Sequence, residues 1–250
     1  MKSIIALTII VFSVAGGAAT AAPVDVSQFK DKIRVACVGD SITAGDGVSK
    51  GNRYPQQLGR MLGDKWDVQE FGVSGATLLN AGDRPYQKEY LFKRAVELKA
   101  DVIIIMLGTN DTKPNNWALI DGFEADYRDL ITKLTAPNTK PHIFIARPCV
   151  VLGKGAFGIT EEVLLKEMPK IDAIAKEVGA DVVDIHAIMS AAAKEKPALI
   201  PDTVHPDAEG AALLAQAFFK AITSKDYDGL PTVLPPPAPR YQPASLTGKK

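Results

Sequence analysis

Short apolar segments alternate with longer helical segments along this chain of 250 residues, and this alternation constrains its fold more than any other feature. Strands are expected at residues 33–38, 68–71, 102–107, 142–146 and 181–185. Helices are expected at residues 54–62, 87–99, 122–134, 161–178 and 208–222, with a shorter one around 187–194. Residues 102–107 show no polar alternation, which is typical of a strand covered on both faces. The pattern predicts an α/β fold with a five-stranded parallel sheet between helices.

The composition excludes several classes of protein. The 29 lysine and arginine residues balance 29 aspartate and glutamate residues, and no basic stripe indicates binding to nucleic acid. The length suits one substantial domain. No histidine or cysteine spacing is typical of zinc, and no phosphate-binding or calcium-binding loop is present. We therefore expect neither a metal nor a cofactor.

Both ends of the sequence differ from the middle. Lys2 is followed by an apolar stretch at 4–14 and small residues at 15–22, which predicts a cleavable signal peptide at 1–21 rather than a buried helix. The protein would then be secreted or periplasmic, and no later segment is long and apolar enough to cross a membrane. We expect a hydrolase domain at 22–228, for the reasons that follow, and a proline-rich tail at 229–250.

Cys37 and Cys149 lie in or at the end of apolar segments. Export permits a disulfide, but two core strands need not be neighbours. We expect both thiols to be unpaired and to pack as small apolar groups.

Four polar segments follow strands or precede the last helix. Ser41 ends the tripeptide Gly39-Asp40-Ser41 after the first strand. Gly75 lies in a glycine-containing loop after the second strand, and Asn110 follows the third. The fourth segment, residues 202–206, leads into the last helix. Because the carboxyl ends of parallel strands open at one edge of the sheet, we expect these loops to converge on one crevice.

The residue types in these loops are those of nucleophilic acyl transfer. Ser41 would be the nucleophile and His205 its base, while Asp202, three residues earlier, would orient the imidazole. The N–H groups of Ser41 and Gly75 and the side-chain amide of Asn110 would stabilise an oxyanion.

Each segment taken alone is ambiguous. Gly-Asp-Ser and Gly-Thr-Asn-Asp are also common turn sequences. His186, which follows Asp184 closely, is a rival base, whereas His142 opens a strand and is expected to be structural. The order of all four segments along the chain is what favours the catalytic interpretation.

In these segments the chain resembles the SGNH hydrolases, also called the GDSL esterase/lipase family. Residues 39–45 resemble the block that carries the serine, Gly75 and Asn110 match the oxyanion positions, and residues 202–205 match the block with the acid and base. The resemblance implies a flavodoxin-like three-layer α/β/α sandwich and hydrolysis of carboxylic esters through an acyl-enzyme. Two positions depart from the family pattern: Glu70, where asparagine is frequent, and Ala76, where aspartate is frequent.

The predicted export and the segment 109–117 also resemble bacterial carbohydrate O-acetylesterases of that family. The resemblance implies a small-molecule or carbohydrate ester as substrate. Trp117 and Tyr86 could either line a sugar platform or anchor loops. Two alternatives stay open: a lipolytic hydrolase of the lysophospholipase or thioesterase type, and a non-catalytic secreted binding protein.

Overall fold

The computed structural model of the protein describes residues 22–135, 140–229 and 233–235. The expected signal peptide lies outside these ranges, as does most of the expected tail. Within them, no helix combines the length and the apolar character needed to cross a membrane.

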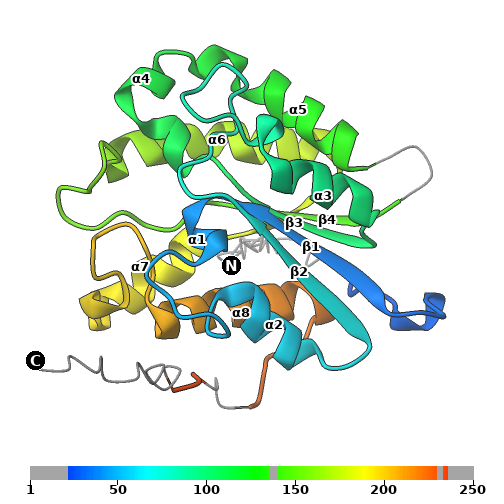
Figure 1. The fold of residues 1–250 in the computed structure, drawn as a ribbon. Coiled ribbons are helices and arrows are strands. Elements are labelled where there is room, and N and C mark those ends of the chain that lie inside the picture. The colour runs from blue at the N-terminus through cyan, green and yellow to red at the C-terminus, as the bar shows by residue number, and fades with distance from the viewer. Residues whose placement is uncertain (1–21, 136–139, 230–232, 236–250) are drawn as a thin grey trace, which may run out of the picture.

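The sheet contains five strands, all parallel, in the order β2-β1-β3-β4-β5 (Figure 1). Its strands are β1 (Ile33–Gly39), β2 (Trp66–Gly72), β3 (Val102–Met106), β4 (His142–Ala146) and β5 (Asp181–Val183). The helices are α1 (Ser41–Ala44), α2 (Tyr54–Leu62), α3 (Tyr90–Leu98), α4 (Pro114–Trp117), α5 (Phe123–Leu134), α6 (Glu161–Val178), α7 (Ile185–Glu195) and α8 (Ala208–Thr223). This order confirms the predicted α/β fold. It places β1 where the chain reverses its direction across the sheet, the position at which such folds bind ligands.

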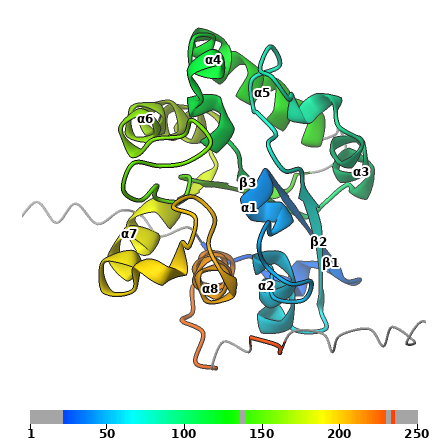
Figure 2. The same cartoon turned by 60° about the vertical axis from the view of Figure 1, so that its left-hand side comes forward.

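Alternate side chains of β1 enter two separate cores. Val35 and Cys37 pack with the helices α2, α7 and α8, whereas Ala36 and Val38 pack with α3, α5 and α6. The two groups of helices lie on opposite faces of the sheet (Figure 2). Because both faces are covered, the central strand β3 is apolar throughout, and all five of its residues are buried. The result is the expected three-layer sandwich.

Two strand boundaries differ from the expectation by two residues, and three others by one. β2 begins at Trp66, two residues early, because Trp66 pairs with Ile33 at the start of β1. β5 ends at Val183 rather than 185 because Asp184 caps α7, accepting a hydrogen bond from the Ala187 N–H (2.9 Å). The hydrogen bond of the aspartate cap stabilises the start of α7, which offsets the free energy lost when β5 stops pairing with β4.

Both cysteines, Cys37 and Cys149, are buried and free. Burial raises the pKa of each thiol above its ordinary value. The expectation that they are unpaired is confirmed, and neither thiol has the character of a reactive thiolate.

The start of the folded body meets the end of α8. The Val24 N–H donates to the Ile222 carbonyl at the end of α8 (2.9 Å). Further along, Leu234 is held by the Asn52 side chain, which donates to its carbonyl (2.8 Å) and accepts from its N–H (2.7 Å). This part of the expected tail therefore lies against the domain.

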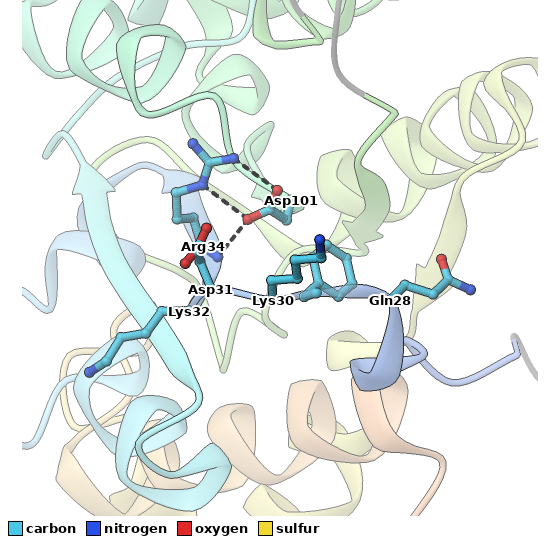
Figure 3. A pocket seen from close by; sticks show the side chains of 7 residues that line it. Gln28, Lys30, Asp31, Lys32, Arg34 and Asp101 are labelled. Atoms are coloured by element: carbon cyan, nitrogen blue, oxygen red, sulfur yellow. Dashed lines mark hydrogen bonds and ion pairs between the residues drawn. The ribbon is translucent and has the colours of Figure 1, made fainter.

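A surface hollow of about 430 Å³ lies at the amino end of the sheet (Figure 3). Its centre is an ion pair in which the Arg34 Nη2 donates to Asp101 Oδ1 (2.9 Å) and Nε donates to Oδ2 (3.0 Å). Asp101 also accepts the Arg34 backbone N–H (2.9 Å). The pair joins the starts of β1 and β3, at the edge opposite to the predicted crevice.

Candidate active site

Ser41 is the first residue of α1, directly beyond the carboxyl end of β1. Asp40 caps this helix, and its Oδ1 accepts the Ile42 N–H (3.0 Å). Two paired glycines, Gly39 and Gly72, allow α1 to lie on the strand ends, since a Cβ on Gly72 would come within 2.1 Å of the Ala44 nitrogen. Side chains at these positions would push the serine out of place.

His205 and Asp202 belong to one tight turn before α8. Asp202 Oδ1 accepts the backbone N–H groups of Val204 (3.0 Å) and His205 (2.7 Å), while Oδ2 contacts the His205 Nδ1 (2.7 Å). The intervening Thr203 has a φ of 75°, an unfavourable conformation for a residue with a Cβ. One carboxylate therefore holds both the turn and the imidazole.

The imidazole reaches the serine. His205 Nε2 lies 2.8 Å from Ser41 Oγ, so the structure joins Ser41, His205 and Asp202 in one chain of hydrogen bonds. Burial favours the neutral form of Asp202, but hydrogen bonds from the backbone and ring of His205 outweigh it and lower the pKa of the carboxyl. A negatively charged partner at Nδ1 keeps the Nε2 of a neutral imidazole free to accept a proton.

The rival bases are engaged elsewhere. His186 Nε2 contacts Glu161 Oε1 (2.6 Å). Asp184, the acidic residue close to it in the sequence, pairs with Arg147 (2.5 Å) and caps α7. His142 pairs with Val102 in the sheet, at the end opposite to Ser41.

The loops that carry Gly75 and Asn110 are bonded to each other. Asn110 is 4% exposed, and its Nδ2 donates to the Ala76 carbonyl (3.1 Å). A side-chain amide has two N–H groups, so the second can donate to another acceptor. Gly75 has a φ of 77°, a conformation that glycine adopts without a steric penalty.

Arg84 holds the peptide group that carries the N–H of Gly75, and the sequence analysis did not identify it. Its Nη1 donates to the Ser74 carbonyl (2.5 Å), and its Nε pairs with Glu89 (2.8 Å). The Ser74 carbonyl and the Gly75 N–H belong to one planar peptide group. A guanidinium on the oxygen therefore orients the N–H of Gly75 and polarises it as a donor. No local motif marks Arg84, since its partner lies 10 residues away.

The two residues that depart from the family pattern, Glu70 and Ala76, both have hydrogen-bond partners in the structure. Glu70 pairs with Arg53 (2.7 Å) and accepts from the Gln56 amide (2.7 Å). Ala76 is fully buried and presents its carbonyl to Asn110. Neither disturbs the placement of Ser41.

Of the two aromatic candidates for a sugar platform, Tyr86 is excluded. Its ring is fully buried, and its hydroxyl donates to the Phe71 carbonyl (2.7 Å), so it anchors a loop. Trp117 is half-buried at the end of α4.

Three buried carboxyl groups lie beneath the site. Burial raises the pKa of Asp40 to about 6 and that of Asp111 to about 7, and it raises the pKa of Glu167 well above its ordinary value. Asp111 accepts the N–H groups of Leu78 (2.9 Å) and Leu79 (2.8 Å). Within the described ranges, no group of three metal-ligating side chains is arranged to hold a metal ion.

Glu167 lies against the backbone of the turn that leads to Asn110. A Cβ built on Gly108 would stand 2.6 Å from its Oε2, and neither carboxyl oxygen has a hydrogen-bond partner among the described residues. Nearby Asp111 and Asp40 add to the cost of ionising it. Burial and these neighbouring carboxyls favour the neutral form of Glu167 in the folded protein.

The substitution Glu167→Gln is expected to make the protein more stable at high pH relative to the wild type. A carboxyl whose pKa is raised by folding contributes stability below its unfolded pKa, and this stability is lost as the pH rises through its folded pKa. Glutamine does not titrate, so the difference in Tm between variant and wild type should grow in favour of the variant from pH 5 to pH 9. Glu162→Gln, on the exposed side of the same helix, is the control. A Tm difference for Glu167→Gln that is equal at both pH values would contradict the assignment.

The model of the GDSL-like Lipase/Acylhydrolase family matches residues 37–213 of the chain. An acetylxylan esterase from Xylanibacter ruminicola is 35% identical over 213 residues, which are 77% of this chain and 44% of that protein. The chain thus spans less than half the length of this curated relative.

Solved structures show the same fold. A carbohydrate acetylesterase from Sinorhizobium meliloti has a TM-score of 0.58 at 21% identity, covering 76% of this chain and 98% of its own. A catalytic mutant of an acetylxylan esterase from Geobacillus stearothermophilus has a TM-score of 0.59 at 23% identity, covering 77% and 94%. The family model spans more than half of the chain and every candidate site residue, so the chain belongs to the GDSL-like lipase/acylhydrolase family.

Proposed function

We propose that this protein is an exported serine esterase that removes short acyl groups, acetyl above all, from carbohydrate esters. The observation that carries the proposal is the chain of hydrogen bonds from Ser41 Oγ through His205 to Asp202, with distances of 2.8 Å and 2.7 Å. The N-terminal pattern of a cationic residue, an apolar stretch and small residues supports export.

The first half-reaction uses the groups around Ser41. His205 Nε2 accepts the proton of the Ser41 hydroxyl as Oγ bonds to the carbonyl carbon of the ester. The electron pair of the carbonyl moves to its oxygen, and this oxyanion accepts hydrogen bonds from the Ser41 and Gly75 N–H groups and from the Asn110 amide. When the oxyanion collapses, the bond to the leaving alcohol breaks and His205 returns the proton to the alcohol oxygen.

The second half-reaction repeats these roles with water. His205 deprotonates a water molecule that attacks the acyl carbon, and the same donors stabilise the second oxyanion. Collapse releases the acid and returns the proton to Ser41. Asp202 stabilises the imidazolium in both halves, and its own proton count does not change.

The choice of a carbohydrate acetyl ester is supported by the relative from Xylanibacter ruminicola, an acetylxylan esterase. We expect the wild-type protein to release acetate from acetylated xylan, and to cleave p-nitrophenyl esters with the highest kcat/KM at the acetyl or propionyl chain. An optimum at octanoyl or longer would favour the lipolytic alternative. No turnover of any ester, together with no labelling of the folded protein by a fluorophosphonate, would favour a binding protein.

A further inference from the structure

Phe157 combines two unfavourable features beside the candidate base. It is large and apolar, yet 63% exposed. Its φ of 56° lies in the left-handed region, which is unfavourable for a residue with a Cβ. Its ring centroid lies 5.6 Å from that of His205, with the planes tilted by 59°. An exposed apolar ring and a strained backbone both cost free energy, and their occurrence together beside a reactive group indicates a function for the side chain.

The loop that carries Phe157, between β4 and α6 (Figure 1), is held in place rather than loose. Its tip is closed by an antiparallel bridge between Ala156 and Ile159, in which the Ile159 N–H donates to the Ala156 carbonyl (2.8 Å). Its base is tied to the His205 turn, because the Leu152 N–H donates to the Thr203 carbonyl (2.9 Å).

A small separate core fastens the same loop to that turn. Ile159 from the loop is buried in one cluster with Val204, the residue before His205. The position of the Phe157 ring relative to the imidazole is therefore set by packing and hydrogen bonds on both sides.

We propose that Phe157 is a specificity-determining residue that binds the sugar of the substrate. This inference rests on the proposed function. In that reaction His205 gives its proton to the alcohol oxygen, so groups beside the imidazole face the alcohol part of the ester. The loops that carry Gly75 and Asn110 face the acyl part. The exposed face of an aromatic ring carries negative charge density, and the C–H groups of a pyranose ring pack on such a face.

Phe157→Gly tests the proposal, because it removes the ring and suits the left-handed backbone. The two substrates are an acetylated methyl xyloside and 2,2,2-trifluoroethyl acetate, whose alcohol has no ring. The ratio of kcat/KM for the sugar ester to that for the small ester is expected to fall about tenfold, through KM of the sugar ester. Phe157→Trp, which keeps an aromatic face, should retain most of the ratio.

Tyr90→Ala is the matched control, since Tyr90 is a 70% exposed aromatic residue at the start of α3. It should leave the ratio unchanged, and the Tm of Phe157→Gly should not fall, because glycine relieves the strained φ. An unchanged ratio in Phe157→Gly, or an equal loss on both esters, would overturn the assignment. Failure of the wild type to cleave either ester would instead count against the proposed function.

Discussion

Replacing Ser41 with alanine is expected to lower kcat for acetyl esters by about 10⁴- to 10⁶-fold, the loss typical of a missing serine nucleophile. Without Oγ no acyl-enzyme forms, and only the oxyanion donors and the substrate contacts still act. The loss of one hydrogen bond to His205 should cost about 1 kcal/mol, so the Tm should shift by only about 2–4 °C. Acetate release under saturating ester measures the first effect and thermal unfolding the second.

Ser27→Ala is the control, because Ser27 is an exposed serine in the turn before β1. It should keep full activity. Intact-mass analysis after treatment with a fluorophosphonate separates the two serines: the wild type and Ser27→Ala should gain one adduct, and Ser41→Ala none. A folded Ser41→Ala protein with wild-type turnover, or with the same adduct, would show that another group is the nucleophile.

Asp202→Asn is expected to lower kcat by about 10³- to 10⁴-fold while the turn before α8 persists. An asparagine oxygen can take the place of Oδ1, which accepts the N–H groups of Val204 and His205. Its NH₂ group would then face the His205 Nδ1, making that atom the acceptor and leaving the proton on Nε2. The imidazole would present a donor to Ser41 and could no longer act as its base.

Asp207→Asn provides the matched control for this prediction. Asp207 caps α8 five positions later, accepting the N–H groups of Glu209 (3.0 Å) and Gly210 (2.8 Å). Asparagine caps helices about as well as aspartate, so this variant should retain both Tm and kcat. Equal activity of Asp202→Asn and the wild type across pH 6–9 would mean that the carboxylate has no part in the reaction.

Much of the fold follows from local patterns. α2, β4 and α6 have the bounds that their patterns predict. Apolar periodicity marks all three, and a glycine follows each of the two helices. Other bounds are set by tertiary contacts. The helix expected at 87–99 begins only at Tyr90, after a 3₁₀ turn at Tyr86–Lys88, since the buried Tyr86 ring fixes that turn.

Some residues of the candidate site can be predicted from local motifs, and others cannot. Ser41, Asn110 and the Asp202–His205 turn are recognisable because each follows a strand or precedes a helix within a short motif. Arg84, Glu167 and Phe157 are not, because what matters about them is a contact made across the fold. The pairing of His186 with Glu161 spans 25 residues and likewise has no signal in the sequence.

The hydrogen bond between Val24 and Ile222 has a consequence for larger assemblies. α8 has 16 residues and is therefore about 24 Å long, and it begins three residues after His205. Val24 thus lies a full helix length from the crevice, whereas the segment after α8 runs back along the domain to Leu234 at Asn52. A second module, such as a polysaccharide-binding unit, could be fused beside Val24 without crossing the mouth of the active site.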